Sequence, residues 1–285
     1  MIPERQWLQW VERAAGSAAT RREVRLGIGD DAALLRPRRG CELAITTDLM
    51  VEGVHFLHAG ARATGARLAT RALSDLAAMG AEPLALFLSS AYPADLPAAW
   101  PRQLYRGLLA ACGAAHAQLA GGDVSSSPGP ILLDVVGVGQ CPAGQALRRS
   151  GACPGDRIYV SGQLGRPQNA PRTARWQLGM ALRRRATAAI DLSDGLSTDL
   201  DHLCQASQVG AEITAASIPT QNLEAALHQG EDYELLFTLP AHRRPPRGFG
   251  LTSIGVITRA SGIYLLHRGA CHPLAPRGWQ HFARV

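Results

Sequence analysis

Apolar side chains recur along this chain with two different periods, and each period predicts a kind of element. Spacing of three and four residues predicts helices over 63–80, 97–119 and 197–208, besides an amphipathic helix within the first 20 residues that carries Trp7, Leu8, Trp10, Val11 and Ala14. In the helix over 63–80, the apolar face is formed by Leu68, Ala72, Leu76 and Met79, and Gly80 follows as a C-terminal stop.

Short apolar and β-branched runs predict the strands. These runs are 43–47, 84–91, 131–138, 157–161, 188–192, 211–215, 233–239 and 251–257, and 24–58 as a whole reads as strand, turn, strand. Strands and helices alternate, which indicates an α/β fold. The break at 141–144 predicts two domains, 1–142 and 143–285, whereas the Arg-, Gln- and Pro-rich stretch 163–187 predicts no element.

Composition and cysteine spacing indicate the cellular location and the state of the thiols that we expect for this protein. No run of 18 apolar residues is present, so we expect no membrane span, and the acidic, Trp-containing start does not resemble a signal peptide. The six Cys have no C-x-x-C spacing, which makes zinc and dithiol redox sites poor interpretations. We therefore expect a cytoplasmic protein with free thiols.

The net charge of +6 comes entirely from Arg, because the sequence contains no Lys. A GxxxxGK[ST] nucleotide loop and a Schiff-base mechanism are thereby excluded. Since Arg is spread along the chain, we expect no nucleic-acid partner. An Arg-rich nucleic-acid binder that retains an inactive nucleotide fold remains an alternative, which steep salt dependence of binding to random DNA would favour.

Many acidic residues lie beside glycine or at the ends of apolar runs. They are Asp30, Asp31, Asp48, Asp75, Asp123, Asp191, Asp194, Glu231 and Asp232. Carboxylates in such places need partners, since an unpaired buried charge is costly. Mg²⁺ bound to carboxylates and substrate phosphates supplies such partners. The pattern therefore points to several Mg²⁺ ions and to phosphoryl transfer, although each acid alone is a weak signal.

Seven motifs in this order resemble the bacterial thiamine-phosphate kinases, within the aminoimidazole-ribotide synthetase-like superfamily. The motifs are Gly-Ile-Gly-Asp-Asp-Ala-Ala (27–33), Thr-Thr-Asp (46–48) with Val-His-Phe (54–56), Leu-Ser-Asp-Leu-Ala-Ala-Met-Gly-Ala-Glu-Pro (73–83), Gly-Gly-Asp (121–123), Arg-Ser-Gly-Ala-x-Pro-Gly-Asp (149–156), Ile-Asp-Leu-Ser-Asp-Gly-Leu (190–196) and Gly-Glu-Asp-Tyr-Glu-Leu (230–235). The resemblance implies two α/β domains with mixed sheets and a homodimer that pairs the N-terminal sheets. It also implies ATP-dependent phosphorylation of thiamine monophosphate to thiamine diphosphate.

The same resemblance implies roles for individual residues. The metal ligands would be Asp31, Thr46, Thr47, Asp48, Asp75, Asp123, Asp191 and Asp194. ATP would contact the Gly122-Asp123 turn, Arg149 and Ser193, and thiamine monophosphate would contact His55, Glu231 and Trp279. Asp48, Asp123, Arg149 and Asp194 would act in catalysis. Arg149 suits this role, because its guanidinium can hold phosphate through two hydrogen bonds.

Two features depart from the family pattern. Val124 stands where the family often has Thr. The stretch 163–187 is shorter than expected, so the sequence leaves the C-terminal wall of the expected active-site cleft undefined. A different acceptor within the same superfamily stays open, although the absence of Lys disfavours selenophosphate synthetase and the motifs at 54–56 and 230–235 disfavour aminoimidazole-ribotide synthetase. A Mg²⁺-dependent phosphatase is a further alternative.

Overall fold

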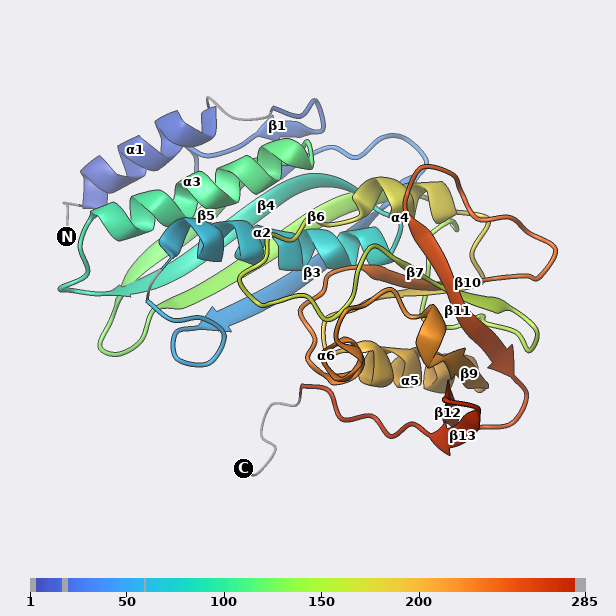
Figure 1. Cartoon of the computed structure of the whole chain (residues 1–285). Coiled ribbons are helices and arrows are strands. Elements are labelled where there is room, and N and C mark those ends of the chain that lie inside the picture. The colour runs from blue at the N-terminus through green and yellow to red at the C-terminus, as the bar shows by residue number, and fades with distance from the viewer. Residues whose placement is uncertain (1–3, 17–19, 59, 280–285) are drawn as a thin grey trace. The chain divides into compact units, whose positions relative to one another are not determined.

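The computed structural model describes residues 4–16, 20–58 and 60–279, and the chain forms two compact units (Figure 1). The first unit comprises Met1–Leu76 and Ala81–Ala143, and the second comprises Ala77–Gly80 and Gly144–Val285. Among the described residues, no helix combines the length and the apolar character needed to span a bilayer.

A four-stranded mixed sheet organises the first unit, in the order β3-β6-β4-β5. These strands are β3 (Cys41–Val51), β6 (Leu132–Pro142), β4 (Glu82–Pro93) and β5 (Gln118–Ser127). All neighbours are antiparallel except β4 and β5, which run parallel. A small antiparallel pair, β1 (Val24–Leu26) and β2 (Leu34–Leu35), contributes apolar side chains to a cluster with β4 and β6.

Helices α2 (Ala61–Ala78) and α3 (Ala99–Ala114) lie along the same face of this sheet (Figure 1). The two helices approach closely because each has a glycine at the crossing. A Cβ on Gly65 would lie 1.9 Å from the Leu104 carbonyl oxygen, and a Cβ on Gly107 would lie 1.9 Å from the Arg62 carbonyl oxygen. Larger side chains at either position would push the helices apart.

Helix α1 (Glu4–Gly16) buries Trp7, Val11 and Ala15. Trp7 stacks on Trp10 and meets Tyr105 of α3 edge-on, with ring centroids 5.1 and 5.2 Å away. Aromatic pairs in these geometries add to the stabilisation that burial provides. The amphipathic N-terminal helix is thus confirmed.

The second unit is built on a seven-stranded sheet in the order β13-β12-β9-β11-β7-β10-β8. The strands are β7 (Arg157–Ser161), β8 (Ala188–Asp191), β9 (Gly210–Thr214), β10 (Leu235–Leu239), β11 (Leu251–Thr258), β12 (Ile263–His267) and β13 (Ala270–Pro273). Only β9 and β12 pair in parallel. Its helical segments are α4 (Trp176–Leu182), α5 (Leu196–Ser207), the 3-10 turn η1 (Ala215–Ser217) and α6 (Leu223–His228).

Two apolar clusters hold this second unit together. One joins α5 and α6 to the sheet through residues such as Leu200, Leu203, Ile213 and Leu236. The other joins α4 to the sheet and includes the stacked rings of Tyr159 and Phe237, 5.5 Å apart. Ala77 and Ala78, at the end of α2, belong to this second cluster, which is why the unit includes Ala77–Gly80.

Several predicted elements are confirmed, and the differences have physical reasons. The helix predicted over 97–119 ends at Ala114, because 118–127 forms strand β5. Met79 lies beyond the end of α2 and is 38% exposed, and Leu8 is 48% exposed, so neither belongs to a buried face. Helix α4 falls within the stretch 163–187, and α6, β12 and β13 were not predicted.

Candidate active site

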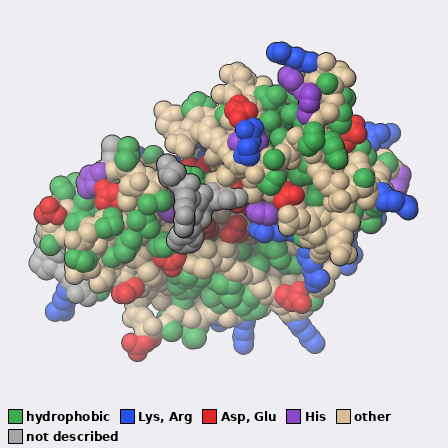
Figure 2. All heavy atoms as spheres, turned by 90° about the horizontal axis from the view of Figure 1, so that it is seen from below, with side chains coloured by type: hydrophobic (Ala, Val, Ile, Leu, Met, Phe, Trp, Pro, Cys, Tyr) green, Lys and Arg blue, Asp and Glu red, His purple; other side chains and the backbone are tan. Residues whose placement is uncertain are grey.

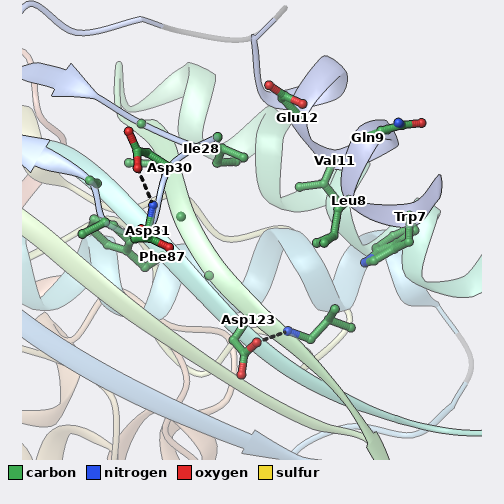
Figure 3. A pocket seen from close by; sticks show the side chains of 18 of the residues that line it. Trp7, Leu8, Gln9, Val11, Glu12, Ile28, Asp30, Asp31, Phe87 and Asp123 are labelled. Carbon is green, nitrogen blue, oxygen red and sulfur yellow. Dashed lines mark hydrogen bonds between the residues drawn. The ribbon is translucent and has the colours of Figure 1, made fainter. Parts of the chain in front are cut away.

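The first unit contains a cleft of about 1240 Å³ beside β5 (Figure 3). Its walls are α1, the glycine loop 27–33, and residues 121–124 of β5, with Phe87 and Tyr105 between them. Trp7, Leu8 and Val11 of α1 make one wall apolar, whereas the carboxylates of Asp30, Asp31 and Asp123 lie on the other walls. Apolar walls with a few polar groups are typical of small-molecule sites.

Local hydrogen bonds orient these carboxylates. Asp30 Oδ1 accepts from the Asp31 N–H at 2.9 Å, and Asp123 Oδ1 accepts from the Val124 N–H at 2.9 Å (Figure 3). Asp31 and Asp123 are both exposed, so solvent ions can reach them. The cleft therefore brings together Asp31, Gly122 and Asp123 of the predicted site.

The two glycines before Asp123 are required by close backbone packing. A Cβ on Gly122, whose φ is +151°, would lie 2.0 Å from the Leu88 carbonyl oxygen, and a Cβ on Gly121 would lie 2.8 Å from the Phe87 ring. Gly122 and Asp123 were predicted in a turn, but they lie within strand β5. The prediction was wrong because Gly-rich, Ser-rich sequence is typical of turns, whereas here it permits close approach to β4.

A second group of predicted ligands lies where β3 faces α2. Thr46 Oγ1 donates to Asp75 Oδ2 at 2.5 Å, and Asp48 Oδ1 accepts from Arg71 Nε at 3.2 Å. Asp48 Oδ2 is buried and has no hydrogen-bond partner among the described residues. Because an unpaired buried carboxylate oxygen is unfavourable, this atom suits a cation ligand.

Thr47 lies on the opposite face of β3 from Thr46 and Asp48. Its hydroxyl donates to Asp134 Oδ1 at 2.8 Å. Asp134 is level with Ser89, and Ser89 with Asp123, so the sheet register places Asp123 on the face of Thr47. The predicted ligands of the first unit are therefore divided between the two faces of the sheet.

His55 follows β3 in a turn closed by its own ring. Its Nδ1 accepts from the Val51 N–H at 3.1 Å, and its carbonyl oxygen accepts from Arg67 Nη2. Because Nδ1 is an acceptor, the neutral ring carries its proton on Nε2. The hydrogen bond to Nδ1 thus fixes the orientation of the His55 ring.

In the second unit, Asp191 ends β8, and the turn that follows carries Ser193 and Asp194. Asp199, in the first turn of α5, is 1% exposed, and its Oδ2 accepts from the N–H groups of Asp194 and Gly195 at 3.0 and 3.1 Å. Burial, together with the charges of Asp191 and Asp194, raises the pKa of Asp199 well above its usual value. Asp194, Asp199 and His202 also offer ligand atoms within 4.8 Å of one another.

Two other segments converge on this turn. Glu231 N–H donates to the Ser193 carbonyl oxygen at 2.8 Å, and Trp279 N–H donates to the Asp194 carbonyl oxygen at 3.1 Å. The residues before them must be glycine, since a Cβ on Gly230 or on Gly278 would lie 2.5 or 2.1 Å from those same oxygens. The structure therefore brings together Ser193, Asp194, Glu231 and Trp279 from two of the motifs and the C-terminal segment.

Arg149 is the predicted residue with the least structural support. It lies in the exposed stretch between β6 and β7, where its carbonyl oxygen accepts from Ser207 Oγ at 3.0 Å. Its role rests on the motif at 149–156.

Sequence reasoning missed several residues around these groups. Arg71 lies one helical turn before Asp75, and this spacing of four residues was an available signal. Asp199 was also detectable, as an acid in the first turn of a predicted helix. The contribution of α1 to the cleft had no sequence signal, because its apolar face predicts only packing.

Charged residues outside these groups serve the scaffold or lie on the surface. Arg21 and Arg38 both donate to Glu82 Oε1 at 2.6 Å, and Arg38 Nε also donates to Glu23 at 2.9 Å, so they tie the start of β1 to β4. These arginines help to hold the pKa of Glu82 below its usual value, although burial acts in the opposite direction. On the face in Figure 2, Arg side chains project at separate places.

Comparison with known proteins identifies one family model and one group of relatives with similar sequences. Residues 29–141 match the family model of the AIR synthase related protein, N-terminal domain. Thiamine-monophosphate kinase of Escherichia coli (strain K12) is 38% identical over an alignment of 312 positions, gaps included, which takes in 93% of this chain and 94% of that protein.

Solved structures agree with this sequence similarity. The crystal structure of thiamine-monophosphate kinase from Stenotrophomonas maltophilia K279a is 33% identical, with a TM-score of 0.81 over 94% of this chain and 98% of that one. AaThiL complexed with AMPPCP and TMP is 30% identical, with a TM-score of 0.78 over 98% and 97%. The two-unit architecture with mixed sheets is the AIR synthase-like fold. The chain belongs to the thiamine-monophosphate kinase family.

Proposed function

We propose that this enzyme transfers the terminal phosphoryl group of ATP to thiamine monophosphate and releases ADP and thiamine diphosphate. The thiamine-monophosphate kinases to which it is similar align with this chain over nearly the full length of both proteins. The observation that carries the proposal is the convergence of Ser193, Asp194, Glu231 and Trp279, because three segments that are distant in sequence meet through direct backbone hydrogen bonds and required glycines. A related protein, AaThiL, is known in complex with AMPPCP and TMP.

We assign ATP to the cleft beside β5. The apolar wall of α1 offers a surface for the base, and Gly122 and Asp123 lie where the polyphosphate would bind. Ser193 and Arg149 are the further ATP contacts that the family motifs imply. The Arg149 guanidinium is exposed and permanently charged, so it is suited to a phosphate.

We assign magnesium to the oxygen donors of the predicted set. Carboxylates and hydroxyls are hard ligands, and the unpaired, buried Asp48 Oδ2 fits a cation. The ligands would be Asp31, Thr46, Asp48, Asp75, Asp123, Asp191 and Asp194, with Thr47 offering its carbonyl oxygen because Asp134 engages its hydroxyl. When bound, magnesium would neutralise phosphate charge that builds up during transfer.

We assign the acceptor to His55, Glu231 and Trp279. A phosphate monoester has a second pKa of about 6 and is already ionised near neutral pH, so the transfer needs no general base. Trp279 is half-exposed and can stack on a cationic aromatic ring. His55 Nε2–H is a donor suited to an anionic or polar substrate atom.

We also propose a cytoplasmic homodimer that pairs the N-terminal sheets. The face of β3 that carries Thr47 exposes a row of large apolar side chains, which continues on the next strand. They are Leu43, Ile45 and Leu49, with Leu132 of β6. Apolar patches of this kind mark interaction surfaces. Sedimentation at micromolar concentration tests the dimer, and a monomer would contradict it.

The test of the proposed reaction is product formation. Purified protein with ATP, Mg²⁺ and thiamine monophosphate should yield thiamine diphosphate, resolved by chromatography. Release of inorganic phosphate without thiamine diphosphate would instead indicate a phosphatase.

A further inference from the structure

The segment that carries Glu231 has an unusual backbone. Gly230, Glu231 and Tyr233 all have positive φ angles, of 74°, 57° and 52°. For residues other than glycine this region is sparsely populated, and it persists only where the surroundings enforce it. Something outside the segment must therefore hold Glu231 in place.

One side of the segment is held by the turn after β8. Glu231 N–H donates to the Ser193 carbonyl oxygen at 2.8 Å, and Tyr233 N–H donates to the Leu192 carbonyl oxygen at 2.9 Å. These bonds fix the N–H groups of the two strained residues. They leave the carbonyl oxygen of Glu231 to be held from the other side.

That other side is formed by Arg172. Its Nε donates to the Glu231 carbonyl oxygen at 2.9 Å. The rest of the guanidinium donates to the carbonyl oxygens of Ala170, Arg166 and Pro167, at 2.6, 3.0 and 3.1 Å. One planar group thus binds the irregular stretch 166–170 to the strained segment, a geometry that the five fixed donors of Arg allow and an ammonium group does not.

The neighbouring Arg175 has a different task. Its Nε and Nη2 form a two-fold ion pair with Glu234, at 2.7 and 2.6 Å, and Glu234 is 2% exposed and also accepts from Ser161 Oγ. Glu234 directly precedes β10, and the pair serves stability, since removing Arg175 would leave a buried carboxylate without its charge partner. Among the described residues, the hydrogen bonds of Arg172 all go to backbone oxygens, and the nearby carboxylates of Asp232 and Glu231 attract its charge.

We propose that Arg172 is a positioning residue that sets the main-chain orientation of Glu231 and thereby the affinity for the acceptor substrate. This inference rests on the proposed function, in which Glu231 contacts thiamine monophosphate. It assigns a purpose to the short stretch 163–187, which supplies Arg172 and the carbonyl oxygens that orient it.

The test is Arg172→Met, with Arg166→Met as the matched control. Arg166 lies in the same stretch, but its guanidinium donates to Pro171 and does not reach Glu231. We expect Arg172→Met to raise the KM for thiamine monophosphate at least about tenfold, because misplacing a binding group by about 1 Å can cost roughly a hundredfold. The KM for ATP should stay close to that of the control, and a single cooperative melting transition should show that the variant is folded.

The experiment distinguishes a failure of this inference from a failure of the proposed function. A wild-type enzyme that makes no thiamine diphosphate would overturn the proposed function itself. An active wild type and an Arg172→Met variant with an unchanged KM for thiamine monophosphate would overturn the inference alone. If Arg172→Met does not fold, Arg172→Lys is used instead, because it keeps the charge but lacks the planar guanidinium. Equal changes in the KM values for ATP and for thiamine monophosphate would show that Arg172 has only a structural role.

Discussion

The N–H of Trp279 donates a hydrogen bond to the carbonyl oxygen of Asp194, at 3.1 Å. This bond joins the C-terminal aromatic residue to the turn that carries the predicted metal ligand. The preceding Gly278 N–H donates to Thr198 Oγ1 at 2.9 Å, so two consecutive N–H groups attach the segment to the start of α5. The position of Trp279 is therefore fixed by its backbone, while its ring remains half-exposed.

From this placement we expect Trp279→Ala to weaken binding of the acceptor selectively. Stacking of a cation on Trp contributes about 0.5–2 kcal/mol. At about 1.4 kcal/mol per tenfold change, the KM for thiamine monophosphate should rise by a few-fold to about thirtyfold. Steady-state kinetics with each substrate varied in turn measures the effect.

The variant Trp279→Phe is the control, since it keeps an aromatic face and should recover part of the affinity. The KM for ATP should barely change in either variant. A rise confined to ATP, or no change in either constant, would mean that Trp279 is a packing residue.

The segment that carries Trp279 should also respond to pH through His228. His228 Nδ1 lies 2.9 Å from Ser197 Oγ, and Nε2 lies 2.9 Å from Arg277 Nη2. Burial and then the nearby Arg277 charge lower the pKa of His228, whereas Glu224 acts weakly in the opposite direction. Because the unfolded chain binds this proton first, stability should fall as the pH drops below about 6.5 towards the folded pKa.

Comparing the wild type with His228→Gln tests this directly. Melting temperatures measured between pH 7.5 and 5.5 should fall more steeply for the wild type, because Gln cannot take up the proton. Parallel curves for the two proteins would show that His228 does not titrate in this range.

Substituting the carboxylates that we assign to magnesium should reduce turnover without unfolding the protein. We expect Asp48→Asn and Asp123→Asn each to lower kcat at least roughly 100-fold, since each removes a negative charge assigned to magnesium. Asp95→Asn, at an exposed acid outside the site, is the control. Near-normal kcat in both site variants, at melting temperatures like that of the control, would refute the metal assignment.

Much of the scaffold could be predicted because its strands and helices carry clear periodic patterns. The strand predicted over 43–47 lies within β3, which continues past Asp48 to Val51, and the helix that carries Asp75 was confirmed as α2; together they place Thr46 against Asp75. The order of motifs along the chain was enough to indicate the family. These features depend on residues that are close together in the sequence, so a single sequence is enough to predict them.

Other features depend on long-range contacts that leave no local pattern. Strand β5 was missed because its glycines matter only when Leu88 of β4 lies against them. Arg172 could not be singled out among 29 basic residues, since its partners are backbone oxygens that any residue type provides. The division of Thr46 and Thr47 between two faces follows from strand alternation, but the partner Asp134 became evident only from the register.

The most direct test of the central claim compares two acceptors with the same enzyme. With ATP and Mg²⁺, thiamine monophosphate should be converted to thiamine diphosphate, whereas free thiamine should not be phosphorylated at a comparable rate, because its hydroxyl needs a general base and the ionised phosphate of thiamine monophosphate does not. Chromatography of the thiamine products after equal times gives both rates. Equal rates on the two acceptors, or no thiamine diphosphate from thiamine monophosphate, would contradict the account.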